Sequence, residues 1–162
     1  VEEVLKNGAD KITINSAAIS NPNLITEVAK RFGSQCMVVA IDTKFVKRQN
    51  KVFSNGGKIE TEKELFSWAK EVENLGAGEI LLTSMNTDGT KSGFAIKITK
   101  QLSELVNIPV IASGGAGTMQ HFEDVFTQTK ATGALAASIF HFNEIEIPEL
   151  KNYLKSKNLP IR

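Results

Sequence analysis

The stretch Val110-Ile111-Ala112-Ser113-Gly114-Gly115-Ala116-Gly117 joins a short apolar run to a glycine-rich turn. An uninterrupted apolar run of this kind is typical of a strand that is covered on both faces. Beyond the turn, Phe122, Val125 and Phe126 are spaced so that they share one face of a helix. The segment therefore predicts a buried strand, a tight turn and a helix, in that order.

The same order recurs along the chain. Further apolar runs predict strands at residues 11–15, 36–41, 79–82 and 134–137, with amphipathic helical patterns between them. Strands that alternate with helices are the signature of an α/β fold with a parallel sheet. No linker or change of composition divides the chain, so we expect residues 1–162 to form a single domain.

Residues 45–60 interrupt this pattern. Two short polar strands flank Asn55-Gly56-Gly57, which predicts a β-hairpin inserted between a strand and the following helix. Thr61, with Glu64 three residues later, predicts a capping box at the start of that helix.

The composition is that of an ordinary globular protein. Of 162 residues, 41% are hydrophobic, and 19 Lys and Arg face 18 Asp and Glu, so the net charge of +1 gives no general attraction to nucleic acid or to an anionic membrane. No apolar run approaches the roughly 20 residues that cross a bilayer, so we expect a cytoplasmic protein. Cys36 is expected to be buried. The first residues read as the end of a helix, so we expect an N-terminal region to be missing.

Two neighbouring turns are candidates for binding a phosphate group. Ser113-Gly114-Gly115-Ala116-Gly117 follows one predicted strand, and Ala137-Ser138 ends the next. Glycine lets the backbone approach a ligand and turn its N–H groups toward an anion, and in (β/α)₈ barrels the loops after the last two strands commonly bind phosphate. A plain tight turn remains the alternative for the glycines.

Two aspartates could take part in chemistry. Asp42 ends a buried strand, where apolar surroundings can raise the pKa of a carboxyl and suit it to proton transfer; a cap or a salt bridge to Lys44 is the alternative. Asp88 stands in Asp88-Gly89-Thr90, which is also a common turn sequence. His121 is expected to help begin a helix, and His141 is expected to be packed or structural rather than a base. No residue cluster has metal-ligand spacing, and no cofactor is expected.

Six segments taken together resemble the cyclase subunit of imidazole glycerol phosphate synthase. The resemblance covers nearly the whole chain in order, and the matching segments are residues 8–18, 38–42, 76–84, 88–93, 111–117 and 136–142. It implies a partial (β/α)₈ TIM barrel that holds strands four to eight, with a hairpin insertion after strand five. Two catalytic carboxylates are implied, of which Asp42 is one and the other belongs to an absent first strand.

The resemblance also implies a reaction and a partner. Ammonia from a glutamine amidotransferase subunit, which would form a heterodimer with this chain, reacts with a doubly phosphorylated ribulosyl aminoimidazole carboxamide. The products are imidazole glycerol phosphate and an aminoimidazole carboxamide ribotide, in histidine biosynthesis. The chain by itself is expected to turn over poorly, because one carboxylate and half of one phosphate site are absent.

Individual residues receive roles by the same resemblance. Asp88 matches an auxiliary polar residue, and Asn86 stands where relatives often have an aspartate. The implied phosphate-binding residues are Asn15, Ser16, Gly89, Ser113, Gly114, Gly115, Ala137 and Ser138, of which Asn15 and Ser16 belong to a second phosphate site. Asp10, Lys11 and Glu79 match an ammonia gate and partner interface at the opposite mouth of the barrel. A surface salt bridge is the alternative for Lys11 and Glu79.

Three other functions stay open. The sister sugar isomerase of the pathway shares the phosphate sites but needs no ammonia. A sugar-modification paralogue could use the same motifs on another substrate. A non-catalytic phosphate-binding half-barrel is the third alternative, and its open sheet edges predict self-association.

Overall fold

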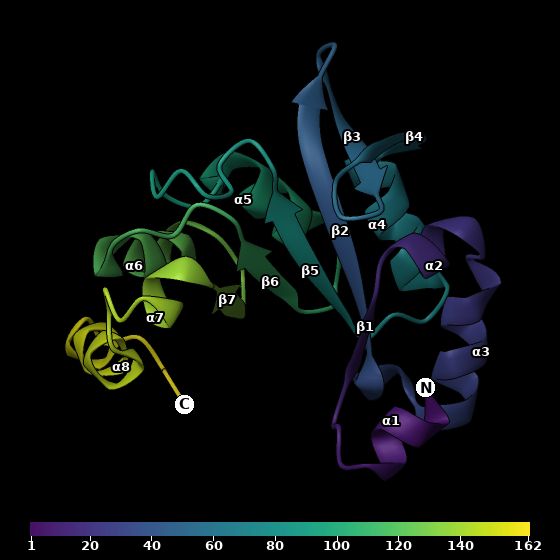
Figure 1. Ribbon diagram of the computed structural model, residues 1–162, viewed down its shortest axis with the longest axis horizontal. Helices are drawn as coiled ribbons and strands as arrows, with labels where there is room; N and C mark the ends of the chain where they lie inside the picture. The colour runs from purple at the N-terminus through teal and green to yellow at the C-terminus, as the bar shows by residue number, and fades with distance from the viewer.

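The computed structural model describes residues 1–162 and shows an α/β fold built on one seven-stranded sheet (Figure 1). Five strands run parallel in the spatial order β1-β2-β5-β6-β7. Their bounds are Ile12–Ile14 (β1), Met37–Val46 (β2), Glu79–Ser84 (β5), Val110–Ser113 (β6) and Gly133–Leu135 (β7). The predicted α/β class with a mainly parallel sheet is confirmed, and it is consistent with part of a TIM barrel.

Helices connect the parallel strands. The five long helices are α3 (Asn23–Phe32), α4 (Leu65–Asn74), α5 (Ile96–Leu105), α6 (Met119–Gln128) and α8 (Ile147–Ser156). The short ones are α1 (Glu2–Lys6), α2 (Ser16–Ser20), α7 (Ser138–His141) and a 3₁₀ turn at Ser34–Cys36. No helix is both long enough and apolar enough to span a membrane.

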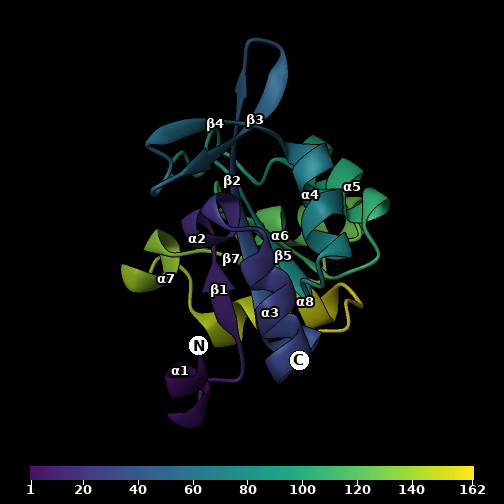
Figure 2. The ribbon, with the colours of Figure 1, turned by 90° about the vertical axis from the view of Figure 1, so that its right-hand side faces the viewer.

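Two antiparallel strands, β3 (Gln49–Ser54) and β4 (Ile59–Glu64), follow β2. Because β2 continues past Asp42 and pairs with β3, the first turn of this antiparallel segment projects beyond the rest of the molecule (Figure 2). The predicted capping box is wrong. Thr61 lies in β4, where its hydroxyl donates to the Val52 carbonyl at 2.8 Å, and α4 is capped by the Glu64 carboxylate, which accepts from the backbone of Phe66 and Ser67.

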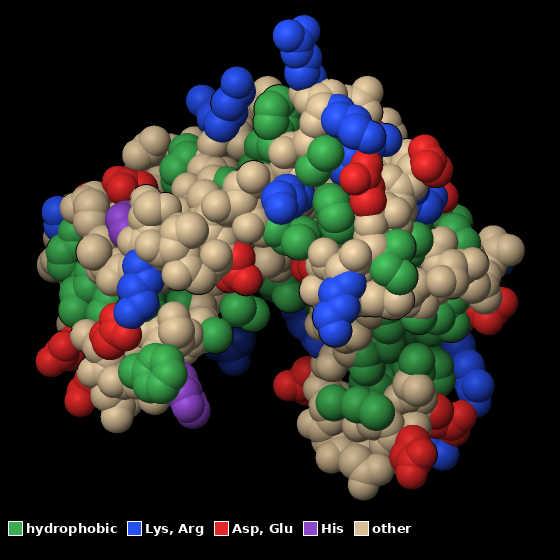
Figure 3. All heavy atoms as spheres, turned by 45° about the horizontal axis from the view of Figure 1, so that its top comes forward, with side chains coloured by type: hydrophobic (Ala, Val, Ile, Leu, Met, Phe, Trp, Pro, Cys, Tyr) green, Lys and Arg blue, Asp and Glu red, His purple; other side chains and the backbone are tan.

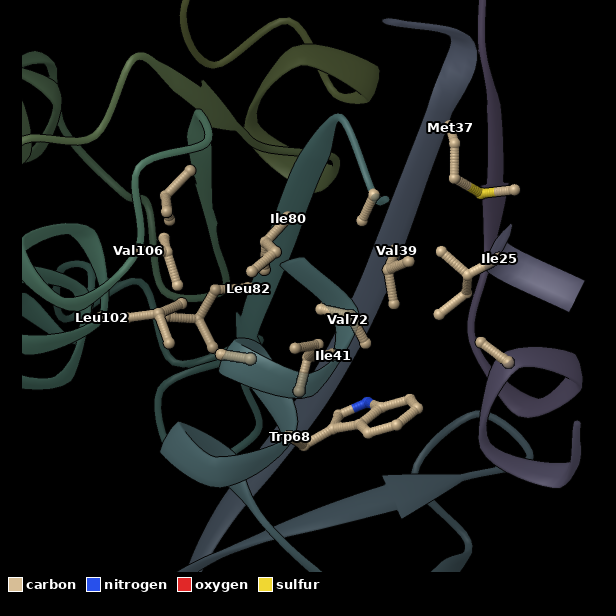
Figure 4. Packing of buried hydrophobic residues seen from close by; sticks show 14 of the residues in the cluster. Ile25, Met37, Val39, Ile41, Trp68, Val72, Ile80, Leu82, Leu102 and Val106 are labelled. Atoms are coloured by element: carbon tan, nitrogen blue, oxygen red, sulfur yellow. The ribbon is translucent and has the colours of Figure 1, made fainter. Parts of the chain in front are cut away.

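The buried apolar residues form two separate clusters. The larger has 19 buried residues and lies between β1, β2 and β5 and the helices α3, α4 and α5. In it, Trp68 and Val72 of α4 lie beside Ile41 of β2 (Figure 4). The smaller has 9 buried residues, centred on Phe122 of α6. Cys36 is buried in the larger cluster, as predicted.

The parallel sheet has two free edges. β1 pairs only with β2, and β7 pairs only with β6. In the space-filling view a wide hollow separates the side of the molecule that carries α1 and α3 from the side that carries α7 and α8 (Figure 3). Large apolar side chains stay exposed in β7 and in the segment after it, namely Leu135, Phe142 and Ile147.

Candidate active site at the carboxyl edge of the sheet

The strand register places the predicted functional residues at one edge of the sheet. Asp42 of β2 pairs with Thr83 of β5, Thr83 pairs with Ser113 of β6, and Ser113 pairs with Leu135 of β7. Because the four strands are parallel, the loops that follow these residues all emerge on the same side. The register therefore brings Asp42 to the same edge of the sheet as the glycine-rich turn after β6.

A cleft of about 200 Å³ opens between three of these loops. Seven of the predicted site residues line it: Asp88, Gly89, Ser113, Gly114, Gly115, Ala137 and Ser138. The other lining residues are Lys91, Ala116, Leu135 and Ala136. The cleft is several times the roughly 30 Å³ that a water molecule occupies in the liquid, so it has room for a small polar group.

The glycines of this cleft are needed for loop packing. Gly114 and Gly115 have φ values of 89° and 103°, in the left-handed region. A Cβ on Gly114 would lie 2.7 Å from the Ser84 carbonyl oxygen, and one on Gly115 would overlap the Gly93 carbonyl. Gly93 in turn donates its N–H to the Gly115 carbonyl at 2.8 Å. The two loops are thus held together backbone to backbone, which also fixes the shape of the cleft.

Asp42 is held by its neighbours at the end of β2. The Asn15 side-chain amide donates to its carboxylate, with 2.9 Å between Nδ2 and Oδ2. Burial raises the pKa of the Asp42 carboxyl; hydrogen bonds from Thr83 and Asn15 oppose the rise, and the negative charge of Asp88 adds to it. Asp42 therefore has the surroundings of a group that exchanges a proton above the usual range for aspartate.

Asp88 and Asn86 lie in the loop after β5. Asp88 is exposed, and its N–H donates to the Ser84 carbonyl at 2.9 Å, so the turn predicted from Asp88-Gly89 is present. Its carboxyl nevertheless lies close enough to Asp42 to affect the pKa of that group. Asn86 accepts the N–H of Phe45 at 2.8 Å and ties the extended end of β2 to this loop.

Asn15 and Ser16 do not line the cleft with the other predicted phosphate-binding residues. The Asn15 amide is engaged with Asp42, while its Oδ1 is buried without a hydrogen-bond partner. The Ser16 hydroxyl accepts the N–H of Asn55 at 2.8 Å, which ties the β3–β4 turn to the start of α2. A second phosphate site at Asn15 and Ser16 stays a prediction.

The two histidines differ in their surroundings. His121 begins α6 as predicted, because its Nδ1 accepts the N–H groups of Gly117 and Thr118 at 3.1 and 3.2 Å. His141 is exposed, and its ring lies against that of Phe142, which is also exposed. The expectation that His141 is packed is wrong, because its side chain is exposed, and a structural role for it stays a prediction.

Lys11 and Glu79 form an ion pair at the opposite edge of the sheet. Glu79 is the first residue of β5, and Lys11 directly precedes β1. Their side chains are 46% and 18% exposed, so the pair is partly accessible to solvent. Asp10, the neighbour of Lys11 in the chain, is exposed. The predicted pairing is present, and its role in an ammonia gate stays a prediction.

Lys91 is the charged residue of the cleft that the sequence did not single out. It stands in the segment Asp88-Gly89-Thr90-Lys91-Ser92-Gly93, but its ion pair partner, Glu144, lies 53 residues away in the chain. No local pattern signals a pair of that separation.

Consecutive β/α units with polar residues gathered at the carboxyl edge of the sheet are the arrangement of (β/α)-barrel enzymes, and this is the class that the fold and the candidate site define. The family model described as "Histidine biosynthesis protein" matches residues 1–146. The chain belongs to this family.

Individual relatives agree with the resemblance predicted from the motifs. The chain is 61% identical over its whole length to imidazole glycerol phosphate synthase subunit HisF of Flavobacterium psychrophilum. It is 58% identical to the subunits of the same name from Phocaeicola vulgatus and Campylobacter concisus. In each comparison all of this chain is matched, and it spans 64% of the length of the relative.

Proposed function

We propose that this chain carries the phosphate-binding part and one catalytic carboxylate of an imidazole glycerol phosphate synthase cyclase site. The proposal rests on the strand register, which pairs Asp42 with Thr83 and Thr83 with Ser113. This register brings Asp42 to the same edge of the sheet as the cleft at Gly114, Gly115 and Ser138. Its substrate would be a phosphorylated ribulosyl aminoimidazole carboxamide, and the reaction would serve histidine biosynthesis. The similarity to synthase subunits supports the synthase rather than the isomerase.

In this proposal Asp42 is a proton-transfer group. Addition of ammonia to a carbonyl and closure of the imidazole ring both require protons to be moved at the substrate, and a carboxyl whose pKa is raised by burial is better suited to exchange them than an ordinary aspartate. Asn15 fixes the carboxylate by its hydrogen bond, so that one oxygen keeps a defined direction. In the mapping onto barrel strands four to eight, the second catalytic aspartate belongs to the first strand, which these 162 residues do not include.

Asp88 and the cleft residues would place the substrate. The backbone N–H groups of the glycine-rich turn after β6 and of the turn at Ala137 and Ser138 would hold a phosphate monoester at one end of it, and Asp88 would act near the reacting centre. Gly89, Ser113 and Ala137 complete the wall of the same cleft. Asn15 and Ser16 would contribute to a site for the second phosphate only if their present hydrogen bonds rearranged.

Lys11, Glu79 and Asp10 would lie on the path of ammonia. The ion pair is at the amino-terminal edge of the sheet, opposite Asp42. We propose that this edge meets a glutamine amidotransferase subunit and that the pair controls entry of ammonia. The word "subunit" in the names of the relatives supports the existence of a partner.

Binding of the reaction product tests the phosphate assignment. In a ¹⁵N NMR titration with imidazole glycerol phosphate, the amides of Gly114, Gly115 and Ser138 should shift. The control ligand, imidazole glycerol without its phosphate, should leave them in place. Shifts confined to other regions, or equal shifts with both ligands, would contradict the assignment.

Turnover tests the reaction. The chain should consume the ribulosyl substrate slowly or not at all, and any turnover should require added ammonium salt. Isomerase activity without ammonia would favour the sister enzyme instead. Turnover at the rate of the full-length Flavobacterium psychrophilum relative would show that the residues by which that relative is longer are dispensable.

A further inference from the structure

One ion pair in the chain reaches into the cleft. Lys91 lines the cleft, and its Nζ lies 2.5 and 2.7 Å from the two carboxylate oxygens of Glu144. Glu144 stands in the segment between α7 and α8. None of the other ion pairs of the chain includes a residue that lines the cleft.

The charges of the cleft make this pair unusual. Lys91 is the only cationic residue in the lining, and Asp88 is the only carboxylate there. With Glu144 engaged, the one positive charge near the cleft is neutralised. A phosphate group would therefore enter a cleft whose lysine already holds an anion.

Lys91 has a fixed backbone. Its φ of 57° lies in the left-handed region, and a Cβ on Gly117 would come within 2.7 Å of the Lys91 Cβ. The residues on either side are also held, since the Thr90 and Ser92 hydroxyl oxygens lie 2.6 Å apart. Redirecting the ammonium group therefore needs only rotation of the lysine side chain, which is 44% exposed and free to turn.

Glu144 is anchored in a similar way. Its backbone N–H donates to the Ile139 carbonyl at 2.9 Å, so its Cα is tied to α7. Its carboxylate offers the lysine two anionic oxygens, as a phosphate group does. The two anions would compete for the same ammonium group.

We propose that Lys91 is a ligand of the substrate phosphate and that Glu144 is an internal competitor that holds the lysine until phosphate enters. This assignment rests on the proposed phosphate site and adds to it a charged ligand and a built-in limit on affinity. When phosphate occupies the cleft, the ammonium leaves Glu144 and donates to a phosphate oxygen. Glu144 then becomes solvated, which its 38% exposed side chain allows.

The test is a titration with inorganic phosphate at constant ionic strength, followed by the ¹⁵N shifts of Gly114 and Gly115. Lys91→Met should weaken binding by roughly tenfold or more, because a charge-assisted hydrogen bond is lost. Glu144→Gln should tighten binding by roughly threefold to tenfold, because the competing anion is removed. In the double variant, the gain from Glu144→Gln should disappear, since no lysine is left to release.

The control is Glu149→Gln, which removes the same charge from the first turn of α8, at a residue that forms no ion pair. It should leave phosphate binding unchanged. Equal tightening by Glu149→Gln, or tightening by Glu144→Gln that persists in the Lys91→Met background, would reduce the effect to general electrostatics and overturn the proposal. So would an unchanged or weakened affinity in Glu144→Gln. If phosphate shifts neither glycine in the unaltered chain, the phosphate site itself fails, and that outcome is distinct from the others.

Discussion

The two parts of the candidate site stand on elements that pack into different buried clusters. Asp42 extends from β2, whose residues Met37, Val39 and Ile41 lie in the cluster of 19 buried residues. The cleft lies beside β6, β7 and α7, which contribute to the cluster of 9. β7 has no buried residue and ends at the exposed Leu135. The carboxylate is thus carried by the better buried part of the fold and the proposed phosphate cleft by the less buried part.

This difference predicts unequal local stability, because segments with few buried apolar contacts open at a lower free energy. The chain contains one tryptophan and one tyrosine. Trp68 lies in the larger cluster, and Tyr153 packs against the smaller one. Trp68 fluorescence and the Tyr153 ring signals in NMR spectra therefore report on the two parts separately.

The largest effect is expected from matched truncations of one isoleucine in each cluster. Ile41 and Ile139 are both fully buried, Ile41 in the larger cluster and Ile139 in the smaller. Ile41→Ala should cost about 4 kcal/mol in the free energy of unfolding, near the upper part of the range for such changes. Ile139→Ala should cost about 2 kcal/mol, because the thinly covered segment can close around the cavity.

Urea unfolding followed by both probes measures these costs. Ile139→Ala should lower the Tyr153 midpoint more than the Trp68 midpoint, whereas Ile41→Ala should lower both. Coincident transitions in the unaltered chain and in both variants would show that the two clusters unfold as one unit. The expected difference in local stability would then be absent.

A smaller effect, dependent on pH, is expected at Asp42. Since burial raises the pKa of this carboxyl in the folded state, the unfolded chain gives up the proton first as the pH rises above the ordinary value of 3.8. The contribution of this group to stability is therefore fully present in acid and is lost as the pH rises through the folded-state pKa.

Asp42→Asn should remove that loss. The variant should be more stable than the unaltered chain at neutral pH, and the gain should shrink toward zero in acid. Trp68 fluorescence in urea at a series of pH values measures it, with the exposed Asp10→Asn as the matched control. A gain that does not vary with pH would mean that Asp42 has an ordinary pKa in the folded chain.

Removing a helix N-cap is expected to cost about 1 kcal/mol in the free energy of unfolding, and each cluster has one such cap. Glu64 caps α4 in the larger cluster, and Thr118 with His121 caps α6 in the smaller one. Glu64→Ala and Thr118→Ala should cost similar amounts, but Thr118→Ala should act chiefly on the Tyr153 transition. Glu64→Gln is the control for the first, because its side chain still carries an acceptor oxygen. Equal displacement of both probes by both variants would argue against separate local stabilities.

Parts of this arrangement were accessible from the sequence because they depend on local pattern. The five parallel strands follow from apolar runs, and the cap at His121 follows from its position before an apolar helix face. The capping box predicted at Thr61 is wrong because this residue takes part in cross-strand pairing, which the local pattern does not show. Glu64 ends β4 opposite Lys51 and caps α4 by itself. The hydrogen bond from Asn15 to Asp42 and the pairing of Lys91 with Glu144 join residues 27 and 53 positions apart, and only the fold reveals them.

The smallest effect is expected from the ion pair between Lys11 and Glu79. Both side chains keep some contact with solvent, so the pair should contribute less than about 1 kcal/mol to stability. A double-mutant cycle of Lys11→Met and Glu79→Gln, read by Trp68 fluorescence, measures the coupling. The pair joins the start of β5 to the residue before β1, at the margin of the larger buried cluster. A weak coupling would therefore leave gating as the reason to hold two opposite charges at this edge, whereas a coupling of several kcal/mol would make the pair a structural element and weaken the case for an ammonia gate.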